Sequence, residues 1–139
     1  MQSNFPSTFS KINAVAMGHN HADLILINCS LVNVYTREIQ KKIQIAITSD
    51  RIAFVGDDAS HCKGPKTKIL DIKNRFVSPS FVDPHIHIDH FITPREFVKK
   101  SLMCGVTSIF PDSIDIVSVC GYRGFKEFVN LTKNLPMRF

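Results

Sequence analysis

The sequence predicts an α/β protein with two parts, a β-rich module followed by alternating strands and helices. Between residues 22 and 77, short apolar runs alternate with turn-forming residues. From residue 81 onward, apolar runs of strand length alternate with amphipathic helical segments. Because alternation of strand and helix is typical of a parallel sheet, we expect a change of architecture near residue 80.

The β module is predicted to span residues 22–80. Its strands are expected at 24–27, 31–34, 43–47, 51–55, 68–72 and 75–77. Turn-forming residues separate them, notably Thr48-Ser49-Asp50 and Gly56-Asp57-Asp58. Residues 1–21 form a polar lead-in, with a short helix predicted from Ser10 to Met17 and ended by Gly18.

Residues 81–139 are predicted to hold two strand–helix units. The first strand ends in His85-Ile86-His87, and the helix after it begins at Thr93-Pro94-Arg95-Glu96. In this segment Thr can cap the helix, Pro fits the first helical position, and Glu can close a capping box. Gly105 ends this helix, and Val106–Phe110 form the second strand. A second helix follows, and Leu135–Phe139 begin a third strand. A (β/α)₈ barrel takes about 250 residues, so this segment accommodates only about two of its units.

Composition and charge exclude several classes of protein. The chain has 139 residues, 44% hydrophobic and 21% charged, with a net charge of +5. The basic residues are scattered and form no stripe for nucleic acid. The sequence shows no secretory signal and no apolar run of about 20 residues, so we expect a cytoplasmic protein without a membrane partner. The 4 cysteines show no C-x-x-C spacing, which favours buried reduced thiols over a disulfide framework or a zinc ribbon.

The candidate metal ligands begin with His85 and His87. Residues two apart in a strand share a face, so the two imidazoles would lie side by side, as a metal ion requires. Asp83 and Asp89 have the same parity and would extend that row, as oxygen ligands or as partners that hold a ligand in place. The two isoleucines between these residues would pack on the opposite side.

Other polar residues have weaker patterns. Asp112 and Asp115 follow the second predicted strand, where the active sites of barrels gather, and they are candidates for residues that support the ligands. Capping of the following helix is the alternative for both. His19-Asn20-His21 repeats the spacing without a preceding strand and is interpreted as a solvated linker, and His90-Phe91 as loop packing.

The order of these motifs resembles the N-terminal part of the adenine deaminases of the metal-dependent amidohydrolase superfamily. The resemblance rests on Val77–His87 followed by Thr93–Phe97, and it covers the chain from about residue 12 onward. Further matching stretches are Ala22–Asn28, Leu31–Ile39, Asp50–Ala53 and Gly105–Ser108.

The resemblance implies a fold and an activity. Residues 22–80 would form the N-terminal portion of a β-sandwich, and residues 81–139 the first two β/α units of an incomplete (β/α)₈ barrel. The expected reaction is the hydrolysis of adenine to hypoxanthine and ammonia, with a purine base as substrate and manganese, iron or zinc as cofactor. His85 and His87 match the metal pair of the family, and Asp89 stands where it usually has Glu. Asp112-Ser113-Ile114-Asp115 falls where the family has Asp-Pro-His-Glu.

We expect little catalysis from these 139 residues alone, because the remaining ligands of the superfamily come from later strands. A complementary C-terminal polypeptide or a homo-oligomer would then cover the apolar faces of Val106, Ile109 and Phe110. Two alternatives stay open: a non-catalytic remnant or interaction module, and an amidohydrolase acting on another cyclic amide such as a dihydropyrimidine or hydantoin.

Overall fold

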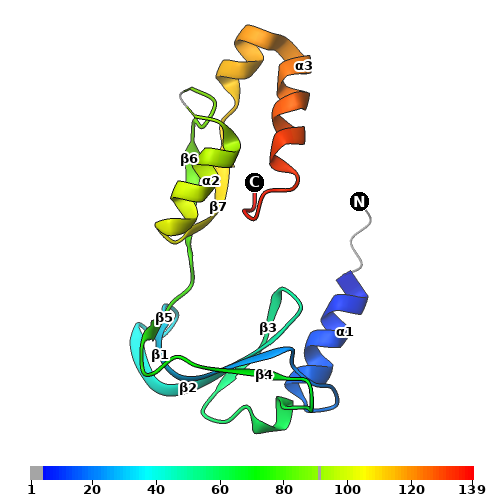
Figure 1. Cartoon of the computed structure of the whole chain (residues 1–139), viewed down its shortest axis with the longest axis vertical. Helices are drawn as coiled ribbons and strands as arrows, with labels where there is room; N and C mark the ends of the chain where they lie inside the picture. Colours follow the sequence, from blue (N-terminus) through cyan, green and yellow to red (C-terminus); the bar gives the residue numbers. More distant parts are fainter. Residues whose placement is uncertain (1–4, 91) are drawn as a thin grey trace. The chain divides into compact units, whose positions relative to one another are not determined.

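The chain forms two compact units, one ending at Pro79 and the other spanning Ser80–Phe139 (Figure 1). The computed structural model describes residues 5–90 and 92–139. Phe91, which was expected to pack a loop with His90, lies outside the described residues. None of the helices in these two ranges is long and apolar enough to cross a membrane.

The first unit is built on a mixed sheet with the strand order β3-β2-β1-β4, and β5 also pairs with β1. Strands β1, β2 and β3 are antiparallel neighbours, whereas β4 and β5 run parallel to β1. Their bounds are Leu24–Asn33 for β1, Glu38–Thr48 for β2, Arg51–Gly56 for β3, Lys68–Asp71 for β4 and Phe76–Val77 for β5.

Strand β1 replaces two strands that the sequence predicts. Its pairing with β2 shifts register between Leu26 and Leu31, where Asn28 has a φ of 56°. The Asn28 side chain donates to Asp71 Oδ1 over 3.0 Å, which holds this irregularity in place. The polar residues that looked like a turn therefore form a bulge inside one continuous strand.

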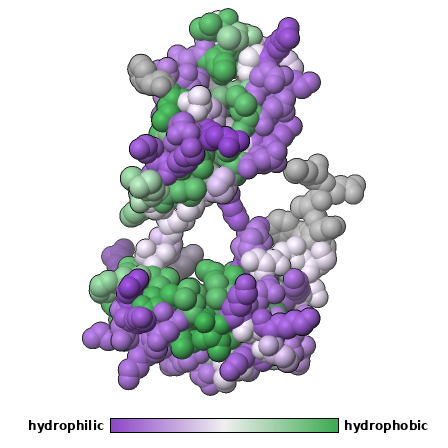
Figure 2. Space-filling model, in the orientation of Figure 1, coloured by the Kyte–Doolittle hydropathy of each residue, from purple (hydrophilic) through white to green (hydrophobic). Residues whose placement is uncertain are grey.

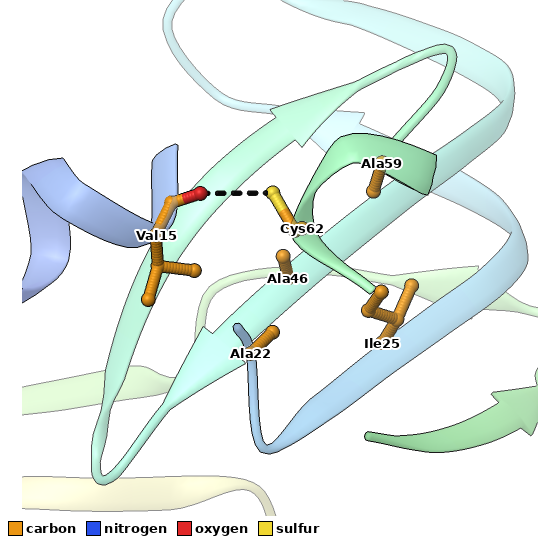
Figure 3. Packing of buried hydrophobic residues seen from close by; sticks show 6 residues of the cluster. All are labelled: Val15, Ala22, Ile25, Ala46, Ala59 and Cys62. Carbon is orange, nitrogen blue, oxygen red and sulfur yellow. Dashed lines mark hydrogen bonds between the residues drawn. The ribbon is translucent and has the colours of Figure 1, made fainter. Parts of the chain in front are cut away.

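Helix α1 (Phe5–Ala16) packs into the core of the first unit. Val15 is fully buried in a cluster with five residues from elsewhere in the unit: Ala22, Ile25, Ala46, Ala59 and Cys62 (Figure 3). The Cys62 thiol donates to the Val15 carbonyl over 3.2 Å, which satisfies a buried polar group at the end of this helix. The polar lead-in of the sequence is thus part of this unit's core. A second cluster, centred on Cys29, Ile43 and Ile45, lies elsewhere in the same unit.

The second unit has the order strand, helix, strand, helix. Its elements are β6 (Phe81–Ile86), α2 (Pro94–Met103), β7 (Val106–Pro111) and α3 (Ile114–Thr132), and β6 pairs with β7 in parallel. Arg138 adds a parallel bridge to Ser108, with its N–H donating to the Thr107 carbonyl over 3.0 Å. This bridge lies where the sequence predicts the beginning of a third strand.

The ends of the helices follow local chemistry. Thr93 Oγ1 accepts the Glu96 N–H at the start of α2, while the Glu96 carboxylate pairs with Lys99 rather than with the cap. Gly105 follows α2 with a φ of +81°, a conformation that favours glycine. Gly121 has a φ of +60° inside α3, and Figure 1 shows the sharp bend of this helix.

One face of β6 and β7 is covered by α2, α3 and the C-terminal segment. Ile88, Val98, Ile109, Phe128 and Met137 form the buried cluster there. The expectation that Val106 and Ile109 would be uncovered is wrong, because Ile109 is only 1% exposed and Val106 packs against the same cluster. Phe110 is 65% exposed and Phe81 67%. Figure 2 shows hydrophobic side chains on the visible surfaces of both units.

Candidate metal centre

The two histidines of the His-x-His motif meet at the end of β6. The strand ends at Ile86, so His85 lies on it and His87 directly after it. Their Nε2 atoms are 3.2 Å apart, and their ring centroids 5.0 Å. This separation suits two nitrogens that face the same ion.

Asp83 shapes the strand rather than joining the histidines. Pro84 has no N–H to donate to a neighbouring strand, and the pairing of β6 with β7 is irregular from Asp83 to Ile86. Asp83 Oδ1 accepts the N–H of His85 over 3.1 Å. The regular alternation assumed from the sequence is broken at this point, and Asp83 instead fixes the backbone that carries His85.

Asp89 lies in the turn after β6. The neighbouring Ile88 is 2% exposed and anchors this turn in the hydrophobic cluster. Asp89 Oδ2 accepts the N–H of Ile116 over 3.0 Å. Asp89 Oδ1 is buried and has no hydrogen-bond partner in the described part of the chain. A hydrogen-bond donor, a water molecule or a cation would satisfy a buried carboxylate oxygen of this kind.

Two further carboxylates come from the region between β7 and α3. The Asp112 N–H donates to the Ile86 carbonyl over 2.9 Å, which ties the ends of the two strands together. Asp112 Oδ1 accepts the N–H of Ile114, and its Oδ2 lies 4.0 Å from His87 Nε2. The carboxylate of Asp112 therefore faces the ring nitrogen that also faces His85.

Asp115 lies on the other side of the His87 ring. Its Oδ2 is 3.3 Å from His87 Nδ1 and 2.5 Å from His90 Nε2. The hydrogen bond from His90 holds the pKa of the Asp115 carboxyl below its usual value, and the nearby charges of His90 and His87 act in the same direction. Asp115 is therefore an ionised acceptor between two imidazoles.

These side chains form two donor groups that share His87. The first contains His85, His87 and Asp112; the second contains His87, Asp89, His90 and Asp115. Within each group one nitrogen or oxygen atom per residue lies within 4.8 Å of the others. Imidazole nitrogens and carboxylate oxygens are ligands of zinc, manganese and iron, so both the donor set and the buried Asp89 oxygen fit a divalent cation.

The structure brings together five of the six residues selected from the sequence and adds one. Asp83 belongs to neither group among the described residues, and Asp89 is grouped with His87 but not with His85. The addition is His90, whose parity along a continued strand would have placed it on the opposite face. Because the chain turns after Ile88, that parity no longer applies.

Comparison with curated proteins gives a consistent answer over most of the chain. The adenine deaminase of Cenarchaeum symbiosum is 52% identical over 132 residues, covering 95% of this chain and 22% of the relative. The adenine deaminase of Ruegeria pomeroyi is 42% identical over 117 residues, covering 84% of the chain and 19% of the relative. Over most of its length, the chain is similar to proteins named adenine deaminase. It spans about a fifth of the length of these curated relatives. No protein-family profile matches the chain.

Two solved structures superpose on part of this chain. The L-hydantoinase of Arthrobacter aurescens superposes with a TM-score of 0.52 at 24% identity, over 63% of this chain and 20% of that one. A prolidase complexed with N-methylphosphonate-L-proline gives a TM-score of 0.51 at 18% identity, over 63% of this chain and 25% of the other. These superpositions show that the chain shares part of its α/β architecture with both structures.

Proposed function

We propose that residues 1–139 form the first part of a cytoplasmic, metal-dependent hydrolase that converts adenine and water to hypoxanthine and ammonia. The observation that carries this proposal is the pair His85 and His87, with Nε2 atoms 3.2 Å apart at the end of a parallel strand. The supporting similarity reaches 52% over nearly the whole chain. The free state of all 4 cysteines in the structure is consistent with a reducing compartment.

Each unit has a proposed place in the larger fold. Residues 22–80 would contribute the N-terminal portion of a β-sandwich, and residues 81–139 the first two β/α units of a (β/α)₈ barrel. Three features support the second assignment: β6 and β7 are adjacent and parallel, a helix follows each, and Arg138 pairs with β7 where a third strand would lie. In barrels of this kind the active site lies at the carboxyl ends of the strands, where these histidines lie.

The sequence favoured His85, His87 and Asp89 as ligands, with Asp112 in a supporting role. Because Asp112 is grouped with both histidines and Asp89 only with His87, the ligands now proposed for this centre are His85, His87 and Asp112. A divalent ion, manganese, iron or zinc, would supply the Lewis acidity that activates water for attack on the ring carbon that bears the amino group. Asp115 would accept the Nδ1–H of His87, which leaves Nε2 free to face the ion and fixes the orientation of the ring. Asp83 positions His85 through its backbone N–H.

A polypeptide limited to residues 1–139 is not expected to deaminate adenine. It has two strands of the proposed barrel, whereas the known folds of this type close with eight. The exposed Phe81 and Phe110 side chains on β6 and β7 are candidates for burial by the remaining strands, supplied by a complementary C-terminal polypeptide or a second copy.

A chimeric enzyme tests the proposal. The 132 residues of this chain that match the Cenarchaeum symbiosum adenine deaminase would replace the corresponding segment of that enzyme. Ammonia release from adenine would be measured after loading with manganese, iron or zinc. We expect turnover by the chimera. His87→Ala should abolish it, and Asp115→Asn should lower it by roughly 10- to 100-fold, as loss of a partner of a metal-binding histidine does.

The outcomes separate the alternatives. A chimera that folds and binds metal but releases no ammonia from adenine contradicts the proposed substrate, and the same preparation would then be assayed with dihydropyrimidines and hydantoins. A chimera that folds without metal favours a non-catalytic remnant. His19→Gln, an exposed histidine of the first unit, is the matched control and should leave turnover unchanged.

A further inference from the structure

Two contacts link His90 to His87 through the carboxylate of Asp115. We propose that His90 is a positioning residue of the candidate metal centre. It holds Asp115 where the carboxylate accepts the Nδ1–H of His87, so that Nε2 of His87 is left to face the ion. This inference deepens the proposed function, on which it rests for the metal role of His87. His90 acts through Asp115 and is not a ligand.

The contact between Asp115 and His87 is loose by itself. Asp115 Oδ2 lies 3.3 Å from His87 Nδ1, and the Asp115 side chain is 45% exposed. The distance exceeds the usual range of N–H···O hydrogen bonds, about 2.7–3.2 Å. An exposed carboxylate with one long contact can turn toward solvent by changing its side-chain rotamer. Asp115 therefore needs a second partner to keep it facing His87.

His90 is that second partner. Its Nε2 atom lies 2.5 Å from the same Oδ2 atom of Asp115. This hydrogen bond is the largest cause of the lowered pKa of the Asp115 carboxyl. An ionised carboxylate accepts hydrogen bonds and cannot donate them, so each histidine nitrogen that donates to Oδ2 carries a proton. The arrangement thus assigns a proton to Nε2 of His90 and to Nδ1 of His87.

The position of the proton on His87 decides which of its nitrogens can bind a metal. A neutral imidazole has one protonated nitrogen and one with a free lone pair. A proton on Nδ1 leaves the lone pair on Nε2, the atom that lies 3.2 Å from Nε2 of His85. A proton on Nε2 would point between the two rings, where the ion is proposed to bind. His90 therefore favours, through Asp115, the tautomer that the histidine pair requires.

The turn that carries His90 is tied to the start of α3. Asp89 Oδ2 accepts the N–H of Ile116, the residue after Asp115, over 3.0 Å. The rings of His90 and His87 are stacked, with centroids 5.5 Å apart and an interplanar angle of 22°. These contacts hold the His90 ring beside Asp115, so little further ordering is needed for their hydrogen bond.

The position of the proton on His87 can be measured by NMR. The 139-residue chain would be labelled with ¹⁵N-histidine and freed of metal with a chelator. Spectra would be recorded at about pH 9, above the ordinary histidine pKa of about 6.5. Long-range couplings between ring protons and ring nitrogens show which nitrogen is protonated, and His87→Gln identifies the His87 signals. We expect the wild-type chain to carry this proton on Nδ1.

Two variants separate the hydrogen bond of His90 from its packing. His90→Gln keeps an N–H donor near the position of Nε2 but loses the ring, whereas His90→Phe keeps a ring and loses the donor. We expect His90→Gln to retain the Nδ1–H tautomer of His87 and His90→Phe to give a mixture of tautomers. Asp115→Asn should give a similar mixture. Adding His90→Phe to Asp115→Asn should cause no further change, because His90 acts through Asp115.

Metal affinity gives a second readout, from titration of the chain with Co²⁺ followed by visible absorption. Loss of a direct partner of a metal-binding histidine costs about 10- to 100-fold in affinity. Because His90 acts one residue further away, we expect His90→Phe to weaken Co²⁺ binding by only about 3- to 10-fold. His90→Gln should weaken it by less than His90→Phe does. His19→Gln, which removes an exposed histidine of the first unit, is the matched control and should change neither readout.

Three NMR results would overturn the proposal: a proton on Nε2 of His87 in the wild-type chain, the wild-type tautomer in His90→Phe, or equal changes in His90→Phe and His90→Gln. A folded wild-type chain that binds no Co²⁺ would overturn the metal role on which the proposal rests. Circular dichroism shows whether each variant is folded, and His90→Leu provides a second test if His90→Phe is not. A failed adenine assay with the chimera leaves the tautomer result unaffected, so this proposal and the proposed function fail separately.

Discussion

Among single residues, Asp23 has a well-defined contribution to the first unit. Its Oδ2 accepts the Ser49 N–H over 2.7 Å and the Thr48 hydroxyl over 3.3 Å, at a turn where Ser49 has a φ of 55°. These hydrogen bonds lower the pKa of Asp23 below its ordinary value of 3.8, and the bond from the Ser49 N–H has the largest effect. Because the folded pKa is below the unfolded pKa, this contribution is present above about pH 3.8 and is lost as the pH falls through the folded pKa.

We expect Asp23→Asn to destabilise the first unit at neutral pH and to have a smaller effect at acidic pH. The amide still accepts a hydrogen bond but lacks the charge, so the variant resembles protonated Asp23. Urea unfolding midpoints at pH 7 and at a pH below the lowered folded-state pKa of Asp23 would measure this difference. Asp57→Asn, at another exposed turn carboxylate of the unit, is the control. A midpoint difference that stays constant with pH would show that the Asp23 charge is not involved.

The cysteines and His90 show what could not be deduced residue by residue. The lack of C-x-x-C spacing favoured buried reduced thiols, and Cys29 and Cys62 are indeed buried, with pKa values raised by desolvation. Cys104 and Cys120 are exposed, because at the end of α2 and on α3 the exposed side is set by helix packing. His90 was missed because parity along a strand cannot anticipate the turn that follows Ile88.

At the scale of elements, the N-terminus of α2 is a direct consequence of its sequence. Thr93 has extended backbone angles and its Oγ1 accepts the Glu96 N–H over 3.4 Å, with Pro94 at the first helical position. Thr93→Ala removes this acceptor, and we expect the free energy of unfolding of the second unit to fall by about 0.5–2 kcal/mol. Thr93→Ser keeps the hydroxyl and should retain most of the wild-type free energy of unfolding. Chemical denaturation followed by circular dichroism would measure both, and equal losses in the two variants would exclude a capping effect.

Elements with local signals were predictable, and those that depend on distant contacts were not. The period of apolar residues and the capping pattern located α2, β6 and β7. The docking of α1 was missed, because it depends on Val15 meeting Cys62 and Ala46, which are far away in the sequence. The continuity of β1 was missed for a similar reason, since Asp71 supports Asn28 from another strand. The donor side chains of the centre are neighbours because of the register in which β6 pairs with β7. No local sequence pattern predicts that register.

At the scale of the whole molecule, the hydrophobic clusters follow the division into two units. Two clusters lie in the first unit, around Val15 and around Cys29, and one lies in the second, around Ile109. The candidate metal centre is built entirely from the second unit, on the same elements as its cluster. Stability of the centre is therefore linked to the packing of Ile88 and Ile109 beneath it.

Separate cores imply separate unfolding, which Ile109→Ala would test. Ile109 is 1% exposed, and its truncation should lower the free energy of unfolding of the second unit by about 2–5 kcal/mol. Amide hydrogen exchange would measure this loss in β7 and α3, while protection in β1 and β2 should stay as in the wild type. Ile114→Ala, at a position 58% exposed in the same unit, is the matched control and should cost less than about 0.5 kcal/mol. If β1 and β2 lost protection together with β7, the chain would unfold as one cooperative body.

Because the donor groups lie in the second unit, Ile109→Ala should also weaken Co²⁺ binding by the chain. A destabilising change in the first unit, Val15→Ala, should leave Co²⁺ binding intact.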